Sequence, residues 1–353
     1  QWNALKLLNA SGEFLSAQDG AEVLEIAERG EYTYAAVDDL GQVTSNKTMG
    51  DYHIRQVKGL SLVNTEAIQK AGFKVAVDCV NSVGGLVIPQ LLKELGVTDI
   101  VELYCEPTGE FPHNPEPLPQ HLSAISAAIK EHKADVGFVV DPDVDRLAIV
   151  NEDGSMFGEE YTLVAVADYI LKHNPGNTVS NLSSTRALCD VTQQYGGSYS
   201  AAAVGEVNVV HEMKRTGAVI GGEGNGGVIY PPLHYGRDAL AGIALFLSHL
   251  ALSGKSCTQL RKSYPEYVIS KNKIELTPDI DVDNVLAIIR DKFSNYKVNT
   301  IDGVKIDFEK EWVHLRKSNT EPIIRIYAES TSEESANALA EKIIQEIKKI
   351  SRK

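Results

Sequence analysis

The sequence predicts an α/β protein made of two successive α/β domains and a smaller α+β domain at the C-terminal end. Apolar runs at residues 73–78 and 136–140 alternate with an amphipathic stretch at 86–95, a pattern typical of strands joined by helical crossovers. The same order of strand, helix and polar loop recurs after residue 157. This recurrence indicates an internal duplication of one α/β unit.

The composition excludes several classes of protein. The 353 residues carry a net charge of −14, which makes a nucleic-acid backbone an unfavourable partner. No apolar run approaches the roughly 18 residues of a membrane span. The four cysteines are widely spaced without a Cys-x-x-Cys pair, which argues against a zinc site and a disulfide framework. We therefore expect a cytoplasmic protein with neither a membrane nor a nucleic-acid partner.

Residues 1–57 are expected to be the C-terminal remnant of a first domain. Trp2 and the leucines that follow it suggest a strand that lacks upstream partners, and residues 21–27 have the apolar spacing of an amphipathic helix. Residues 51–69 predict a connecting helix with a break.

The second domain is expected over residues 58–156 and the third over 157–264. The predicted elements of the second domain are strands at 73–78, 100–104 and 136–140, helices at 86–95 and 122–132, and a proline-rich loop at 107–119. Those of the third are helices at 161–171, 207–213 and 239–251, strands at 178–182 and 218–220, and a glycine-rich loop at 221–227. A last domain over 265–353 alternates strands with helices and ends in a helix at 332–350.

The acidic loop Asp141-Pro142-Asp143-Val144-Asp145-Arg146 follows the buried strand 136–140 directly. Ligands of such sheets bind at the carboxyl ends of the strands, and three carboxylates converging there need a cation between them. Mg²⁺ suits an all-oxygen ligand set. The alternatives are a polar surface turn, an EF-hand loop, and a phosphatase whose strand-end Asp is the nucleophile. An EF-hand is disfavoured because Arg146 stands where that loop needs Gly, and because strands flank it.

The glycine-rich loop 221–227 carries one carboxylate, Glu223, and one amide, Asn225. Glycines let a backbone approach a ligand closely, and a carboxylate beside an amide suits the hydroxyl groups of a sugar. The alternative is a flexible loop without a ligand.

A third loop, residues 316–325, places two guanidiniums around short polar side chains. Arginine matches phosphate oxygens geometrically, and small polar residues with exposed N–H groups complete an anion site. The residues concerned are Arg316, Ser318, Asn319, Thr320 and Arg325. The alternative is a solvated hairpin turn.

For His113 and for the pair Arg237 and Asp238, a structural role is preferred over a functional one. His113 lies between prolines and is interpreted as structural rather than as a metal ligand. Arg237 and Asp238 precede the apolar helix 239–251 and are interpreted as an ion pair and an N-terminal cap, with a substrate contact as the alternative.

Together, in this order and spacing, the three loops resemble those of the α-D-phosphohexomutase superfamily, which includes phosphoglucomutase, phosphomannomutase and phosphoglucosamine mutase. The resemblance spans essentially the whole chain. It implies tandem phosphohexomutase-type α/β domains with mixed sheets flanked by helices, a smaller α+β C-terminal domain, and one cleft to which four domains each contribute a loop. The first of these loops carries a catalytic phosphoserine in the family.

The resemblance also implies roles for individual residues. Asp141, Asp143 and Asp145 would bind Mg²⁺, and Arg146 would lie beside the phosphoserine. Glu223 and Asn225 would hold sugar hydroxyls. The non-transferred phosphate would be bound by Arg316, Ser318, Asn319, Thr320 and Arg325. The expected activity interconverts the 6-phosphate and 1-phosphate of a hexose or hexosamine through a phosphoserine and a bisphosphate.

Departures from the family pattern refine these expectations. The serine loop, which ends in Ser-His-Asn-Pro, is expected just upstream of Gln1 and is absent from the chain, so the fragment itself is expected to be inactive. Asn225 stands where Ser is common and Gly227 where His is common, which points to an amino sugar and to phosphoglucosamine mutase. The alternatives are phosphoglucomutase or phosphomannomutase, a metal-dependent sugar phosphatase, and a sugar-phosphate binding module. Val144 replaces a usual Gly, and this change is expected to matter little.

Overall fold

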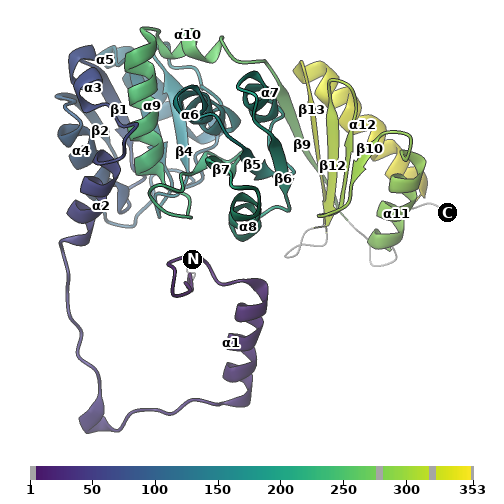
Figure 1. Cartoon of the computed structure of the whole chain (residues 1–353), viewed down its shortest axis with the longest axis horizontal. Helices are drawn as coiled ribbons and strands as arrows, with labels where there is room; N and C mark the ends of the chain where they lie inside the picture. The colour runs from purple at the N-terminus through teal and green to yellow at the C-terminus, as the bar shows by residue number, and fades with distance from the viewer. Residues whose placement is uncertain (1–4, 276–280, 318–322, 351–353) are drawn as a thin grey trace.

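A computed structural model describes residues 5–275, 281–317 and 323–350. It contains two mixed α/β sheets with helices on their faces, followed by an antiparallel sheet with its own helices (Figure 1). The N-terminal residues form an arm that extends away from these sheets (Figure 1). The predicted fold class is thereby confirmed. We propose that the sheets mark domains with the boundaries expected from the sequence, near residues 57, 156 and 264.

The first sheet has the strand order β2-β1-β3-β4, in which β1 is parallel to both β2 and β3 and β4 is antiparallel to β3. Every residue of β3 and β4 is buried, as expected for strands covered on both faces. The elements are β1 (Lys74–Asp78), α4 (Gly84–Glu94), β2 (Asp99–Leu103), α5 (Ser123–His132), β3 (Val136–Val140) and β4 (Leu147–Asn151).

The second sheet repeats this arrangement. Its order is β6-β5-β7-β8, again with parallel pairs on both sides of the central strand and an antiparallel last pair. The repeated topology confirms the predicted duplication. The elements are α6 (Glu159–His173), β5 (Thr178–Asn181), α7 (Ala187–Gln194), β6 (Tyr199–Ala202), α8 (Glu206–Thr216), β7 (Ile220–Glu223) and β8 (Gly227–Ile229).

Two parts of these sheets differ from the sequence-based expectation. Strand β4 was not predicted, and residues 221–227 are not one loop, because Gly221, Gly222 and Glu223 belong to β7 and Gly227 to β8. Both motif loops are therefore the tight turns of antiparallel hairpins, β3–β4 and β7–β8. Glycine is depleted in strands, so local propensity gives no signal for β7.

Helix α9 (Ala239–Ser253) joins the two sheets into one unit. It packs against α6 and against two helices of the N-terminal third, α2 (Met49–Lys58) and α3 (Thr65–Ala71). The predicted connecting helix with a break thus exists as α2 and α3. Phe246 of α9 makes edge contacts with Phe138 and Phe157, and one hydrophobic core runs through both sheets. A short helix, α10 (Cys257–Arg261), follows.

The C-terminal sheet has the order β10-β11-β12-β13-β9, is antiparallel throughout, and has a separate hydrophobic core. It stands beside the second sheet, next to α7 and β6 (Figure 1). Its elements are β9 (Val268–Glu275), α11 (Val282–Lys292), β10 (Lys297–Asn299), β11 (Val304–Asp307), β12 (Trp312–Lys317), β13 (Ile323–Ser330) and α12 (Glu333–Ile350).

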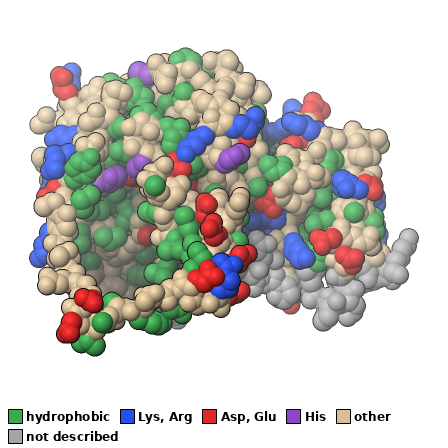
Figure 2. Space-filling model, turned by 60° about the horizontal axis from the view of Figure 1, so that its bottom comes forward, with side chains coloured by type: hydrophobic (Ala, Val, Ile, Leu, Met, Phe, Trp, Pro, Cys, Tyr) green, Lys and Arg blue, Asp and Glu red, His purple; other side chains and the backbone are tan. Residues whose placement is uncertain are grey.

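The N-terminal arm contains α1 (Ala17–Arg29), which confirms the predicted helix and begins with a capping box between Ser16 and Asp19. The predicted strand near residues 2–14 is wrong for the residues described, which show only an isolated bridge between Leu8 and Phe14. Apolar side chains along the arm are exposed, and the arm frames a hollow in which further hydrophobic side chains are visible (Figure 2). Among the described helices, none combines the length and the apolar character needed to cross a membrane.

Candidate active site

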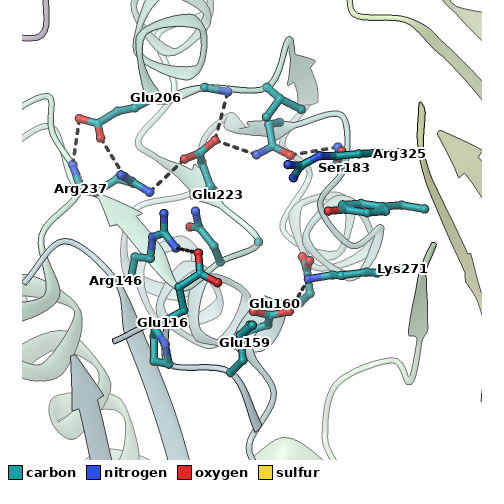
Figure 3. A pocket seen from close by; sticks show the side chains of 18 of the residues that line it. Glu116, Arg146, Glu159, Glu160, Ser183, Glu206, Glu223, Arg237, Lys271 and Arg325 are labelled. Carbon is teal, nitrogen blue, oxygen red and sulfur yellow. Dashed lines mark hydrogen bonds and ion pairs between the residues drawn. The ribbon is translucent and has the colours of Figure 1, made fainter. Parts of the chain in front are cut away.

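A cavity of about 520 Å³ lies where the ends of the two α/β sheets face the C-terminal sheet (Figure 3). It brings together residues from all the predicted loops that the structure describes. Its charged and amide lining residues are Glu116, Arg146, Glu159, Glu160, Asn181, Glu206, Glu223, Asn225, Arg237, Lys271, Arg316 and Arg325. The acidic loop adjoins this cavity through Arg146 rather than lining it with its aspartates.

The acidic loop is the turn between β3 and β4, and its backbone brings the three carboxylates together. Asp141 Oδ1 accepts hydrogen bonds from the N–H groups of Asp145 and Arg146, each at 3.0 Å. One carboxylate oxygen of each of Asp141, Asp143 and Asp145 lies within 4.8 Å of the other two. Asp141 and Asp145 are buried, whereas Asp143 is exposed.

The cluster has a cationic neighbour in Arg146, whose Nε lies 3.6 Å from Asp141 Oδ2 and 3.9 Å from Asp145 Oδ1, but its oxygen atoms also fit a metal ion. Burial, together with the charge of Asp145, raises the pKa of Asp141 to about 6. Asp145 Oδ1 is buried and has no hydrogen-bond partner among the described residues, although a buried acceptor of this kind is rarely left unpaired. An all-oxygen set with an unpaired acceptor matches the ligands that Mg²⁺ prefers.

Lys6 of the N-terminal arm also reaches this cluster. Its ammonium group contacts Asp143 Oδ2 and lies 3.5 Å from Asp145 Oδ2. Sequence analysis missed this residue, because nothing in the local sequence around Lys6 relates it to a loop that lies 137 residues further along the chain.

The backbone of Val144 differs from the expectation that a Val in place of Gly matters little at this position. Its φ angle is +60°, in the left-handed region where an L-residue costs roughly 1–2 kcal/mol and a β-branched side chain is unusual. Its carbonyl oxygen accepts a hydrogen bond of 3.1 Å from Ala239 N–H at the start of α9. The conformation explains why Gly is usual at this position, so replacing Gly by Val is not neutral.

Glu223, at the end of β7, is held by three neighbours. Its Oε1 accepts hydrogen bonds from Asn181 Nδ2 at 2.8 Å and from Gly205 N–H at 3.2 Å, and its Oε2 lies 3.1 Å from Arg237 Nη1. A carboxylate offers about four acceptor directions. These contacts therefore leave one direction for a group in the cavity.

Asn225 lies at the tip of the same hairpin and lines the cavity. The glycines beside it serve a different purpose from the one expected. A Cβ on Gly224 would lie 2.0 Å from Glu160 Oε2, and one on Gly226 would lie 2.3 Å from the Leu147 carbonyl oxygen. These glycines are thus required by packing against the protein itself, not only by a ligand.

Arg237 connects the acidic loop to the glycine hairpin. Its guanidinium lies 2.6 Å from Asp145 Oδ2, 2.8 Å from Glu206 Oε2 and 3.1 Å from Glu223 Oε2 (Figure 3 shows the last two contacts). Arg237 thus forms ion pairs, but with these three carboxylates rather than with Asp238, whose charged contacts are His53 and His234. Asp238 caps α9, since its side chain accepts a hydrogen bond from Ala241 N–H.

The arginines of the third loop lie at directly opposed positions of β12 and β13, because Arg316 pairs with Arg325 in the sheet register. Like charges at such positions repel each other, which favours an anion close to both. Arg316 also lies 3.8 Å from Asp302 Oδ2. The predicted residues Ser318, Asn319 and Thr320 lie outside the described residues.

Other residues that line the cavity were not identified from the sequence, because they stand in none of the three motifs. Lys271 of β9 pairs with Glu159 and reaches the cavity. Glu160 lies under the backbone of Gly224, and burial raises the pKa of its carboxyl to about 8. His113 Nε2 lies 3.0 Å from Asp78 Oδ2, which supports its structural interpretation.

Three family descriptions match successive parts of the chain. These are phosphoglucomutase/phosphomannomutase alpha/beta/alpha domain II over residues 51–154, domain III over 158–267, and the C-terminal domain over 273–346.

Individual relatives agree with this assignment. A phosphoglucomutase/phosphomannomutase of Thermococcus kodakarensis is 34% identical over 97% of this chain and 74% of its own length. A protein of Methanopyrus kandleri named as a probable phosphoglucosamine mutase is 28% identical over 99% of this chain and 76% of its own length. The crystal structure of a phosphoglucomutase/phosphomannomutase family protein from Burkholderia thailandensis superimposes with a TM-score of 0.81 and 26% identity, covering 96% of this chain and 71% of that one. The chain therefore belongs to the phosphoglucomutase/phosphomannomutase family of the α-D-phosphohexomutase superfamily.

Proposed function

We propose that this chain forms the greater part of a phosphoglucosamine mutase, which interconverts glucosamine 6-phosphate and glucosamine 1-phosphate. One observation carries the proposal. Arg146 and Arg325 lie on opposite sides of a single cavity, with Glu223 between them (Figure 3). Two cationic sides with a hydrogen-bond acceptor between them suit a sugar that carries phosphate at both ends.

Each described side chain of the cavity has its own role in binding the substrate. Arg316 and Arg325 bind the phosphate that is not being transferred, because two arginines at directly opposed positions of neighbouring strands favour an anion between them. Glu223 uses its remaining acceptor direction for a sugar hydroxyl, and Asn225 both donates and accepts. Arg146 orients the phosphoryl group that is transferred. We propose that Ser318, Asn319 and Thr320 complete the phosphate site.

Asp141, Asp143 and Asp145 would hold Mg²⁺, and the buried oxygen of Asp145 that accepts no hydrogen bond supports this assignment. When bound, the ion supplies stabilisation of negative charge on the transferring phosphoryl group. Lys6 contacts two of the same carboxylates, so we propose that its ammonium group turns toward the phosphoryl group when the aspartates hold the ion.

The reaction requires two phosphoryl transfers. Phosphate passes from a phosphoserine to a sugar hydroxyl and gives a bisphosphate, and the other phosphate of this bisphosphate then returns to the serine. The bisphosphate must therefore bind in two opposite orientations. A fixed pair of arginines at one side of the cavity serves both orientations, because either phosphate presents the same oxygen geometry.

The choice of an amino sugar rests on Asn225 and on the name of the Methanopyrus kandleri relative. The test is a comparison of kcat/KM for the 6-phosphates of glucosamine, glucose and mannose, measured on the chain completed with the phosphoserine segment of a relative. We expect the highest value for glucosamine 6-phosphate. A higher value for glucose or mannose 6-phosphate would assign the activity to phosphoglucomutase or phosphomannomutase instead.

Residues 1–353 contain no Ser-His-Asn-Pro segment, so we propose that these residues alone bind glucosamine 6-phosphate without converting it. Calorimetric titration should show binding, while the assay for glucosamine 1-phosphate should show no product. Turnover by these residues alone would contradict the proposal that the phosphoserine segment is required.

A further inference from the structure

A second cluster of ligand-type side chains lies outside the cavity. His53 belongs to α2, whereas His234 and Asp238 flank the segment that leads into α9. Their side chains converge on one carboxylate oxygen, since His53 Nε2 lies 2.7 Å and His234 Nε2 lies 2.9 Å from Asp238 Oδ2. All three atoms lie within 4.8 Å of one another.

The carboxylate of Asp238 is held in place for this role. Its Oδ1 accepts the hydrogen bond from Ala241 N–H that caps α9, so Oδ2 is left facing the two imidazoles. The Asp238 side chain is only 8% exposed, so both imidazoles approach a buried carboxylate oxygen.

The two imidazoles open onto a cavity of about 370 Å³ between α2 and the segment before α9. Tyr52, Gln56 and Pro232 help to line it. The side chains of His53 and His234 are 34% and 42% exposed, while that of Asp238 is 8% exposed. An ion bound here would have a buried anionic ligand, two nitrogen ligands at the surface, and room for water.

We propose that His53 Nε2, His234 Nε2 and Asp238 Oδ2 form a binding site for a divalent transition-metal ion of the Zn²⁺ class, with water as the remaining ligand. Two imidazoles and one carboxylate are ligands that such ions take. Mg²⁺ prefers oxygen ligands, so this site and the acidic loop select different ions. The wide spacing of the cysteines gave no indication of it.

Binding of the ion requires two changes. Each imidazole, whose Nε2 now donates to Asp238, must carry its proton on Nδ1 instead, so that Nε2 can bind the ion, and the ligand atoms must move apart. A tetrahedral ion with bonds of about 2.0–2.1 Å holds neighbouring ligand atoms about 3.3 Å apart. The two nitrogen–oxygen distances of 2.7 and 2.9 Å must therefore each open by about half an ångström. Rotation of two partly exposed imidazoles can supply this change without moving the backbone.

The position of the site gives the ion a structural effect. It would connect α2 with the segment that also carries Arg237, which lies between His234 and Asp238 in the sequence. Because Arg237 joins the acidic loop to the glycine hairpin, an ion here would restrain the backbone on which that connection depends.

The test is calorimetric titration with Zn²⁺ in excess Mg²⁺, using the Asp143→Asn variant so that the acidic loop does not compete. His53→Gln and His234→Gln are then introduced separately. His132→Gln, an exposed histidine at the end of α5, is the matched control. We expect one equivalent of tightly bound Zn²⁺ in the parent and in the control. Loss of an outer-shell partner weakens metal binding roughly 10- to 100-fold. Loss of either histidine ligand should weaken Zn²⁺ binding by more than this.

Equal Zn²⁺ affinity in the control and in both His variants would overturn the proposal and leave the cluster as a pair of hydrogen bonds to Asp238. Should a variant fail to fold, the Co²⁺-loaded parent decides the matter. Intense visible absorption from a low-coordinate ion supports the site, and the weak spectrum of an octahedral oxygen-ligated ion refutes it. Hydrogen exchange gives a further readout, because bound Zn²⁺ should slow exchange in α2 and in the segment before α9.

Discussion

Replacing Arg237 by Met removes the cation that holds three carboxylates at the centre of the molecule. The Arg237 side chain is 10% exposed, and its carboxylate partners Asp145, Glu206 and Glu223 are 12%, 10% and 7% exposed. Met preserves most of the apolar stem but none of the positive charge. The substitution therefore leaves three buried anions from three different elements facing one another.

Removing one partner of a buried ion pair costs about 3–5 kcal/mol of folding stability, and this sets the expected effect of the substitution. The three contacts share one guanidinium, so their contributions are not added. Because the carboxylates are almost fully screened from solvent, we apply no reduction for exposure. We expect Arg237→Met to lower the free energy of unfolding of the two-sheet unit by about 3–5 kcal/mol near neutral pH.

Urea unfolding near neutral pH, followed by far-UV circular dichroism, measures the loss of stability. Arg215→Met is the matched control, since the Arg215 side chain is 62% exposed and pairs with Glu212 at the surface.

The control should change stability by no more than about 0.5 kcal/mol. The reasoning is refuted if Arg237→Met costs as little as Arg215→Met.

The remaining predictions concern metal binding, pH dependence and phosphate binding. Asp143→Asn should weaken Mg²⁺ binding at least about tenfold, as measured by calorimetry. Asp153→Asn, a control in the turn after β4, should leave the Mg²⁺ affinity unchanged. Equal affinities of the two variants would contradict a metal site in the acidic loop. The pKa of Glu160 is raised from the ordinary value of 4.5 to about 8, so stability due to this group is present below pH 4.5 and is lost as the pH rises toward 8. Glu160→Gln should remove this dependence, which is at most about 1.4 kcal/mol per pH unit, and an unchanged pH profile of unfolding would contradict the raised pKa of Glu160. Arg316→Lys should weaken binding of glucosamine 6-phosphate about tenfold or more, because Lys cannot bind phosphate with two parallel hydrogen bonds. Arg290→Lys, which changes an exposed arginine of α11, should bind it as the parent does, and no difference between the two variants would contradict a role of Arg316 in the phosphate site.

The sequence predicted those parts of the fold that are encoded locally. Helix α9 is a long apolar segment and β3 a short one, and both have clear ends, so the pattern of apolar residues predicts them. Strand β7 was misplaced because two of its four residues are glycines, whose presence depends on contacts with distant residues such as Met213 and Leu163. Such contacts leave no local trace in the sequence.

The candidate site divides in the same way. The acidic loop and the arginines of β12 and β13 stand in short motifs, so the sequence identified them. Lys6 and Arg237 reach the site across 139 and 92 residues of chain, and no spacing rule predicts such pairings. The left-handed conformation of Val144 was equally hidden, because a backbone angle imposed by a hairpin overrides the preference of the residue.

We propose that this one cavity transfers phosphate within a sugar rather than releasing it to water. The most direct measurement is phosphorus NMR of glucosamine 6-phosphate incubated with Mg²⁺, a trace of the 1,6-bisphosphate, and the chain completed with a phosphoserine segment. We predict a growing resonance of glucosamine 1-phosphate and almost no inorganic phosphate. Inorganic phosphate as the main product would contradict the mutase and indicate a metal-dependent sugar phosphatase.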